Sequence, residues 1–468
     1  MQRSSCTWSR RLCGTAVLVA VLVAVLGAVL GATPAWAQTA AGPAASAPAA
    51  ASGFRVRPVD DAWRAALPRD AAAATQAYLD RLPADVVARS NAYYEGGYWL
   101  RLWGFLAGLA VAALLLATRP STAVRDWAAR RLKRPLLRDA AYGAFYAVAG
   151  WALTLPLTIY ESFVREHAYA MATQNFGAWF GEQLVALAAS VVVAALLAPL
   201  LYAVLRRAGA QWWLWGTAVT LAFMVLAVAV APVWIEPLFN TYQPVEDGPE
   251  KTAVLAMARA NGVPVDNVYV FDASRQTTRV SANVSGLFGS AAVRLNDNLL
   301  RRASEPEIRA VMAHEIGHYA MNHIAKTLVM VGVVVMLGFL FSQWAMHRLL
   351  ARFGPRWRLH GVADVASLPL LAAVLGSYLF VATPLLNTIT RTQEVEADLW
   401  GLNLAREPHG EAEVLLKLVE YRKADPGTIE ELIFFDHPGT RTRIYNAMRW
   451  REQMLPAQAG AAKPERVK

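Results

Sequence analysis

The sequence is poor in cysteine, in histidine and in charged residues. Only two of its 468 residues are cysteines, Cys6 and Cys13, so the rest of the chain can hold neither a disulfide framework nor a cysteine zinc site. A metal bound there would need His, Asp or Glu ligands, and the chain has only eight histidines. Charged residues make up 17% of the chain, against about 25% in a soluble protein, and 56% of the residues are hydrophobic. These proportions exclude a mainly disordered chain and favour a membrane protein.

The net charge is +10, from 45 Lys and Arg against 35 Asp and Glu. The basic residues form short clusters between apolar runs rather than one patch, which is typical of the cytoplasmic loops of membrane proteins. We therefore expect the lipid bilayer as a partner, and no nucleic acid.

Six apolar runs are each long enough to cross the hydrocarbon core of a bilayer, about 30 Å thick, as a helix. They are approximately Trp99–Thr118, Ala140–Tyr160, Leu184–Leu205, Leu214–Val233, Thr327–Met346 and Leu368–Ile389. A further run, Thr15–Leu30, follows two arginines and precedes Ala35-Trp36-Ala37, a pattern typical of a cleavable signal peptide. A retained first transmembrane helix is the alternative interpretation of this run.

Basic clusters follow the first, third and fifth of the six runs. Their members are Arg119, Arg125, Arg130, Arg131, Lys133, Arg134 and Arg138, then Arg206 and Arg207, then Arg348, Arg352, Arg356 and Arg358. Because positively charged loops stay in the cytoplasm, we expect residues 234–326 and the C-terminal segment on the periplasmic side of a bacterial-type inner (plasma) membrane.

The segment between the fourth and fifth runs has both strand and helix signals. Asn267–Asp272 predicts a strand, and Ser281–Leu295 predicts a hairpin interrupted by Gly286 and Gly289. Ser304-Glu305-Pro306-Glu307 is a capping box with proline in the first turn, which predicts that a helix begins here.

This helix carries the sequence His314-Glu315-Ile316-Gly317-His318. Histidines four residues apart lie on one helical face, so both imidazoles can bind one Zn²⁺ per chain. Glu315 can then take a proton from a metal-bound water. The competing interpretation is a helix surface on which two histidines have structural partners.

A catalytic zinc needs a third protein ligand and an open position for water. Glu394 and Asp398 are also four residues apart on a predicted helix, whereas Glu396 points away from their face. We predict Glu394 as the third ligand and Asp398 as the acceptor for the outer N–H of a ligating histidine. A solvated acidic helix start is the alternative for this stretch. His323 lies five residues beyond His318, which on a continuous helix would turn it away from the zinc, so we expect a structural or supporting role for it.

Several stretches together resemble the type-I CAAX prenyl proteases, which are integral-membrane zinc metalloendopeptidases. The stretches are Pro237-Leu238-Phe239-Asn240 with Glu246-Asp247-Gly248, Val268–Asp272, Asp297–Leu300, the form H-E-x-G-H-x-x-x-N-H from His314 to His323 with Asn322, the set Asn387, Arg391, Glu394, Ala397 and Asp398, and His437-Pro438 with Arg443-Ile444. The resemblance covers about Ala84 to Arg449.

The resemblance implies zinc on His314, His318 and Glu394, with Glu315 as general base. It also implies that His437 and Arg443 lie near the catalytic centre, where His437 would steady the oxyanion or the substrate backbone. Asp398, Asn322 and Asn387 match the family's motifs and are expected to support the ligands. Asn283, Val284 and Ser285 lie in the segment expected to bind substrate as an added strand, although the family usually has an aromatic residue where this chain has Asn283.

The implied fold is mainly α. It is a polytopic α-helical membrane protein, with about seven transmembrane helices around a chamber, that carries a zincin-like α+β metallopeptidase domain. The expected segments are 1–37, signal peptide or first transmembrane helix; 38–98, linker and extramembrane helical segment; 99–233, four transmembrane helices; 234–326, catalytic domain; 327–390, two transmembrane helices; 391–454, third-ligand helix and C-terminal catalytic segment; and 455–468, disordered tail.

We therefore expect a membrane-embedded zinc metalloendopeptidase that acts on a peptide or protein, with C-terminal or lipidated substrates among the candidates. Quality control of misfolded membrane or secreted proteins is the alternative within the protease class. A periplasmic catalytic domain would argue against prenylated cytosolic substrates. A metal-regulated transporter would need more ionisable residues in mid-span than this chain has. An inactive homologue is disfavoured because Glu315 is retained beside both histidines.

Overall fold

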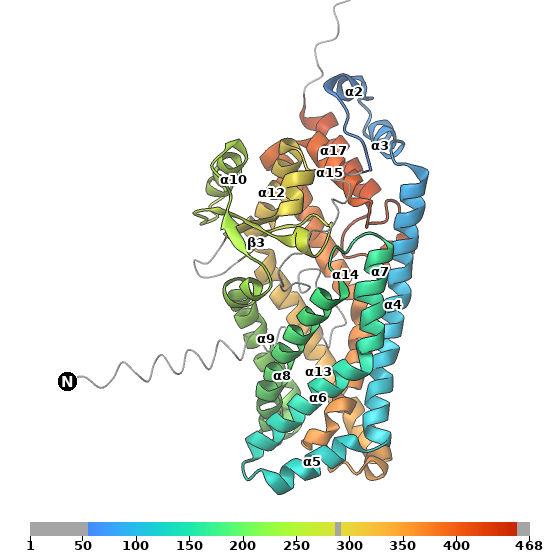
Figure 1. Ribbon diagram of the computed structural model, residues 1–468, viewed down its shortest axis with the longest axis vertical. Helices are drawn as coiled ribbons and strands as arrows, with labels where there is room; N and C mark the ends of the chain where they lie inside the picture. The colour runs from blue at the N-terminus through green and yellow to red at the C-terminus, as the bar shows by residue number, and fades with distance from the viewer. Residues whose placement is uncertain (1–54, 286–291, 456–468) are drawn as a thin grey trace, which may run out of the picture.

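A computed structural model of the chain describes residues 55–285 and 292–455 (Figure 1). The fold is mainly helical, as predicted. Its principal helices are α2 (Asp61–Ala66), α3 (Ala71–Leu79), α4 (Ala84–Ala117), α5 (Pro120–Arg131), α6 (Pro135–Ile159), α7 (Arg165–Ala168), α8 (Phe176–Arg207), α9 (Trp212–Val230), α10 (Pro249–Ala260), α11 (Asp297–Arg302), α12 (Glu305–Ala320), α13 (His323–Trp357), α14 (Leu368–Ala405), α15 (Pro408–Leu418), α16 (Thr428–Phe434) and α17 (Thr440–Met454).

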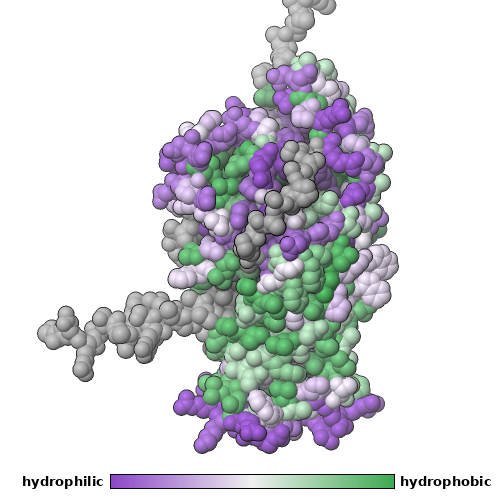
Figure 2. Space-filling model, viewed as in Figure 1, coloured by the Kyte–Doolittle hydropathy of each residue, from purple (hydrophilic) through white to green (hydrophobic). Residues whose placement is uncertain are grey.

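Six helical segments are long and apolar enough to span a membrane. They are Ala84–Ala117, Pro135–Ala168, Phe176–Arg207, Gly209–Trp234, His323–Trp357 and Val365–Ala405, and they match all six predicted spans, of which only the first extends beyond its helix, by one residue. Figure 2 shows hydrophobic side chains gathered over this helical part, with hydrophilic surfaces above and below it. The run Thr15–Leu30 lies outside the described residues, so the structure counts six spans where the resemblance implied seven.

The three predicted basic loops lie together at one end of the helical part. They join α4 to α6, α8 to α9, and α13 to α14, and helix α5 lies at this end in Figure 1. The strands and helices α10, α12, α15 and α17 lie at the opposite end. This arrangement agrees with the charge pattern, which predicts that successive loops lie on alternate sides of the membrane.

Four of the predicted segment boundaries fall inside continuous helical segments. Helix α4 runs through the boundary at 98/99, α13 through 326/327 and α14 through 390/391. The segment Gly209–Trp234 runs through 233/234. Apolar composition ends where a helix leaves the bilayer, but hydrogen bonding within the helix continues into water. Helix α14 is therefore one continuous helix that contains both a membrane span and the predicted third-ligand region.

A small sheet lies at the end away from the basic loops. Its strands β1 (Tyr242–Pro244), β2 (Val268–Phe271), β3 (Ala282–Ser285) and β4 (Ala292–Asn296) follow the order β1-β2-β4-β3. Strand β2 is the predicted strand, and it pairs parallel to β4. Strands β3 and β4 form the predicted antiparallel hairpin, and the two glycines expected to interrupt it lie outside the described residues. Apolar side chains of the sheet, α10 and α12 share one core, which fixes α12 against the sheet.

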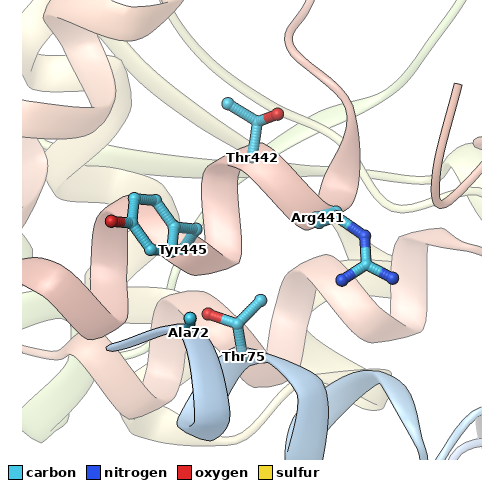
Figure 3. A pocket seen from close by; sticks show the side chains of 5 residues that line it. All are labelled: Ala72, Thr75, Arg441, Thr442 and Tyr445. Carbon is cyan, nitrogen blue, oxygen red and sulfur yellow. The ribbon is translucent and has the colours of Figure 1, made fainter. Parts of the chain in front are cut away.

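The helices before the first span pack against the last helices of the chain. Side chains of α3 share a core with α15 and α17, and Arg81 pairs with the buried Glu413 at 2.7 Å. A groove of about 310 Å³ between α3 and α17 is lined by Ala72, Thr75, Arg441, Thr442 and Tyr445 (Figure 3). None of the predicted site residues lines this groove.

Candidate metal centre

Helix α12 presents two histidines on one face. Its start is the predicted capping box, in which the backbone N–H of Ser304 donates to Glu307 at 2.8 Å. Because His314 and His318 are one turn apart, their Nε2 atoms approach to 3.1 Å. His314 is buried and His318 is half-buried, so the pair opens toward solvent on the side of His318.

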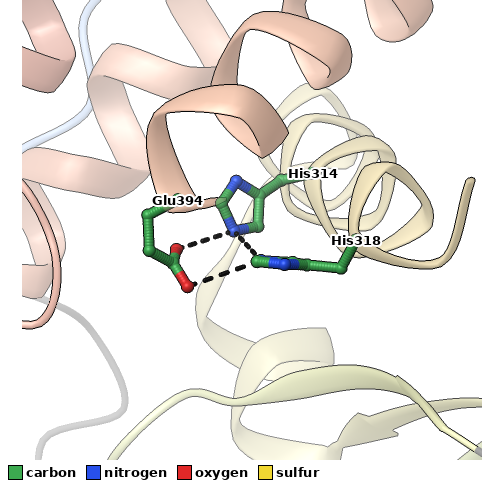
Figure 4. A group of neighbouring side chains, drawn as sticks. All are labelled: His314, His318 and Glu394. Atoms are coloured by element: carbon green, nitrogen blue, oxygen red, sulfur yellow. Dashed lines mark hydrogen bonds and ion pairs between the residues drawn. The ribbon is translucent and has the colours of Figure 1, made fainter. Parts of the chain in front are cut away.

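Helix α14 brings a carboxylate to the same point. Oε2 of Glu394 lies 3.2 Å from Nε2 of His314, and Oε1 lies 3.5 Å from Nε2 of His318. Figure 4 shows the three side chains converging from the two helices. Their ligand atoms lie within 4.8 Å of one another, and they form the candidate metal group within the described ranges.

Two glycines let α12 and α14 approach closely enough for this convergence. A Cβ on Gly401 would lie 2.9 Å from the backbone nitrogen of His314, and a Cβ on Gly317 would lie 3.2 Å from the Trp400 side chain. A side chain at Gly401 would force the two backbones apart, whereas one at Gly317 would require its neighbours on α14 to shift by a few tenths of an ångström. The separation between the histidines and Glu394 therefore depends on both glycines.

The geometry of the three ligands fits zinc. Zinc bonds of about 2.0–2.1 Å in a tetrahedron separate the ligand atoms by about 3.3–3.4 Å. The two imidazole nitrogens are 3.1 Å apart, and the two oxygens of Glu394 lie 3.2 Å from His314 and 3.5 Å from His318, respectively. Oε2 of Glu394 is also buried, and its neighbours among the described residues are the Nε2 atoms of His314 and His437, each at 3.2 Å. A buried carboxylate is costly unless positive charge compensates it.

Behind His314 lies a buried chain of charges. Oδ1 of Asp398 contacts Nδ1 of His314 at 2.8 Å, and Arg443 donates to both oxygens of Asp398, at 2.6 and 2.9 Å. Glu411 lies 3.6 Å from the Arg443 guanidinium. Asp398 thus contacts the outer nitrogen of His314, and Arg443 reaches the group of three side chains only through Asp398.

Burial and charge shift the pKa values of these groups. Burial opposes the protonated form of His314, but the contacts with Asp398 and Glu394 raise its pKa well above its usual value. Burial would lower the pKa of Arg443, but Asp398 and Glu411 raise it instead. Burial, helped by the charge of Asp398, raises the pKa of Glu411. The surroundings of His314 therefore favour positive charge.

The general base predicted from the sequence stands beside the ligands. Glu315 follows His314 on α12 and makes no hydrogen bond or ion pair with the described residues. Burial raises its pKa above 4.5, and the neighbouring His314 and His318 oppose this increase. A carboxyl group with a raised pKa is suited to accept and return a proton near neutral pH.

His437 approaches the ligands from the loop before α17. Its Nε2 lies 3.2 Å from Oε2 of Glu394, and its Nδ1 lies 2.8 Å from Asp436. Asn387 does not touch the ligands: it donates to the carbonyl of Ile433 at 2.7 Å, at the end of α16. Asn387 therefore supports the chain that leads to His437 rather than a metal ligand.

Asn322 is exposed and lies in the turn between α12 and α13, with φ of 54°, rather than against a ligand. Asparagine tolerates this left-handed conformation better than most residues. Asn283, Val284 and Ser285 lie in β3, one of the two outer strands of the sheet that the structure describes. Val284 points into the domain core, so what β3 offers at this position is its backbone.

Sequence reasoning missed the contacts of His323. Its Nδ1 lies 2.8 Å from Nδ1 of His318, and its Nε2 lies 3.0 Å from Glu396. The expectation that His323 faces away assumed a continuous helix. The chain instead turns at Asn322 between α12 and α13, and this turn brings the ring of His323 to His318. The left-handed preference of Asn322 was the available signal.

Comparisons with known proteins agree with this architecture. A model of peptidase family M48 matches residues 246–451, and a model of the CAAX prenyl protease N-terminal region, described as five membrane helices, matches residues 67–241. In the second range the structure has four candidate spans. The chain belongs to peptidase family M48.

The two family matches and the candidate spans make the chain a multi-pass membrane metalloendopeptidase, which acts on peptides or proteins. It is 26% identical over 352 residues to the uncharacterized metalloprotease YhfN of Bacillus subtilis, covering 75% of this chain and 82% of that protein. It is 33% identical over 179 residues to CAAX prenyl protease 1 of Saccharomyces cerevisiae, covering 37% of this chain and 39% of that one.

The crystal structure of S. mikatae Ste24p has the same fold. The TM-score is 0.68 at 20% sequence identity, over 79% of this chain and 90% of that one. The two chains therefore share their fold, and the six candidate spans of this chain agree with the membrane protein that the resemblance implied.

Proposed function

We propose that this M48 member is a zinc metalloendopeptidase in which His314, His318 and Glu394 hold the metal. The observation that carries the proposal is the convergence of these three ligands, at separations suited to tetrahedral zinc, beside the half-buried Glu315. When bound, zinc would lower the pKa of a water toward about 7 and polarise the scissile carbonyl.

In this proposal Glu315 accepts the proton of the attacking water and later delivers it to the leaving amine. Its position directly after His314, free of partners among the described residues, leaves the carboxylate available. His437 lies on the open side of Glu394 at 3.2 Å and would stabilise the oxyanion or hold the substrate backbone. Asp398, held by Arg443, keeps Nε2 of His314 directed at the metal.

The substrate would bind as an added strand on β3. Strand β3 lies at one edge of the described sheet, and addition of a strand to a sheet edge is a common way to bind extended peptides of varied sequence. Asn283, Val284 and Ser285 would lie beside the added strand.

Two substrate classes fit this geometry. C-terminal or lipidated peptides are suggested by the CAAX prenyl protease 1 relatives, of which the matched regions cover 63% in Dictyostelium discoideum and 39% in S. cerevisiae. The basic loops at the end opposite the ligands favour a periplasmic catalytic end in a bacterial-type inner membrane. That side favours misfolded membrane or secreted proteins over prenylated cytosolic ones.

The proposal is tested with detergent-purified protein and its Glu315→Gln variant on a panel of quenched peptides. The panel includes a farnesylated C-terminal CAAX peptide and its unprenylated twin. Zinc-dependent cleavage that disappears in Glu315→Gln while zinc content is unchanged would support the proposal, and the farnesyl preference would separate the substrate classes. If the wild type binds zinc but cleaves no peptide that the variant leaves intact, the proposal is refuted.

A further inference from the structure

The two histidine ligands are supported from behind in different ways. The outer nitrogen of His314 contacts a carboxylate directly, at Asp398. The outer nitrogen of His318 instead contacts another imidazole, that of His323, at 2.8 Å. His323 is buried, with only 3% of its surface exposed, and its other nitrogen lies 3.0 Å from Glu396. Lys326 donates to the same carboxylate oxygen at 2.6 Å.

The turn after α12 makes this arrangement possible. Because Asn322 adopts a left-handed conformation, α13 begins at His323 in a new direction, and the ring of His323 meets that of His318 edge to face at 4.9 Å between centroids. Glu396 is on the face of α14 opposite that of Glu394. The contact from His323 to Glu396 therefore fastens α13 to α14 directly behind the metal ligands.

The contacts allow one consistent arrangement of protons. His318 must present the lone pair of Nε2 to a metal, so the neutral ring carries its proton on Nδ1. That N–H can donate only if Nδ1 of His323 is unprotonated, which places the His323 proton on Nε2, facing the Glu396 carboxylate. Each group in the chain then has a matching donor or acceptor.

We propose that His323, held by Glu396, is a positioning residue that fixes the orientation and tautomer of His318 for metal binding. The support of His318 thereby ends on a carboxylate, as that of His314 does, but through an intervening imidazole. This inference rests on the metal centre of the proposed function and does not depend on peptidase activity.

Two pairs of variants separate positioning from packing. His323→Asn keeps a polar group near the place of Nδ1, whereas His323→Leu fills the site without any acceptor. Glu396→Gln keeps an acceptor for Nε2, whereas Glu396→Ala removes it at a half-exposed position where the fold is tolerant. Thr327→Val is the matched control, because Thr327 donates to Gln393 at 2.9 Å and also joins α13 to α14 without touching His318.

The measurement is zinc affinity of the full-length protein in detergent, by competition with a chromophoric chelator, together with the absorption spectrum of the cobalt form. Loss of a residue that supports a ligand typically weakens metal binding by about 10- to 100-fold. We expect this loss, with a changed cobalt spectrum, for His323→Leu and Glu396→Ala. His323→Asn, Glu396→Gln and Thr327→Val should retain most of the affinity.

The proposal is overturned if Glu396→Ala binds zinc as tightly as Thr327→Val does, or if His323→Asn is as weak as His323→Leu. If His323→Leu does not fold, the Glu396 pair and His323→Asn still decide the question. A wild type that binds zinc tightly but cleaves no peptide would refute the proposed function and leave this inference standing.

Discussion

Replacing Arg443 by methionine should destabilise the protein far more than the same change two residues earlier on the same helix. Arg443 is buried and donates two hydrogen bonds to the buried Asp398, with Glu411 close by. Methionine keeps the bulk of the stem but leaves two buried carboxyl groups without their cation. Arg441, by contrast, pairs with Asp425 at the surface, and the two side chains are 42% and 57% exposed.

The expected magnitudes follow from burial. Removing one partner of a buried ion pair costs about 3–5 kcal/mol, because the remaining charge stays out of water. An exposed pair contributes about 0–1 kcal/mol. Arg443→Met should therefore lower the free energy of unfolding by at least about 2 kcal/mol more than Arg441→Met. Adding Asp398→Asn to Arg443→Met should restore part of the loss, because the uncompensated carboxylate is then gone.

The assay is denaturant unfolding of metal-free protein in detergent, followed by tryptophan fluorescence, so that weaker zinc binding does not contribute. Circular dichroism before unfolding serves to check that each variant is folded. If Arg443→Met and Arg441→Met are equally stable, or if the Asp398→Asn change adds its full cost to that of Arg443→Met, the buried-pair reasoning is wrong.

Three further predictions follow. Gly401→Ala should weaken zinc binding, because its Cβ would lie 2.9 Å from the backbone of His314. The control is Gly376→Ala on the same helix, whose Cβ meets nothing within 4 Å and which should bind zinc as the wild type does. Equal zinc affinities of the two variants would contradict the packing argument. Burial, helped by the charges of two arginines, lowers the pKa of His409 from 6.5 to about 4, so only the unfolded chain takes up this proton between these pH values. The stability, measured by thermal unfolding in detergent, should therefore fall as pH drops through that window, and His409→Asn should reduce this dependence on pH. If the variant keeps the same dependence, it arises from other groups. A cysteine introduced at Arg130, in a chain without its two native cysteines, should react with a membrane-impermeant thiol reagent only after the cytoplasmic face is opened, and labelling of intact spheroplasts would reverse the proposed orientation.

Local patterns were enough to predict which of the candidate ligands share a helix face. The capping box and the four-residue spacing act within one or two turns of helix, where backbone geometry fixes which side chains share a face. The same holds for Glu394 and Asp398 on α14. The six spans could also be predicted, because a bilayer requires long apolar runs.

Contacts that depend on a turn or on distant packing could not be predicted in this way. His323 reaches His318 only because one residue, Asn322, leaves the helical conformation. Arg443 meets Asp398 across 45 residues of sequence, and only the family resemblance pointed to it. Glu411 gave no signal at all, because a lone glutamate on an amphipathic helix usually faces water.

The candidate ligands lie on helices that are continuous with, or directly precede, membrane spans. Helix α12 ends three residues before α13 begins, so the helix that carries both histidines leads directly into a span. The third ligand lies on α14, which is itself a span that continues out of the apolar region. The positions of the ligands relative to one another are thus set where α12 packs against α14, with Gly317 and Gly401 at the contact. A soluble fragment cut at the membrane boundaries would separate the histidines from Glu394 and Asp398, so we expect the proposed metal centre to need the membrane helices for its assembly.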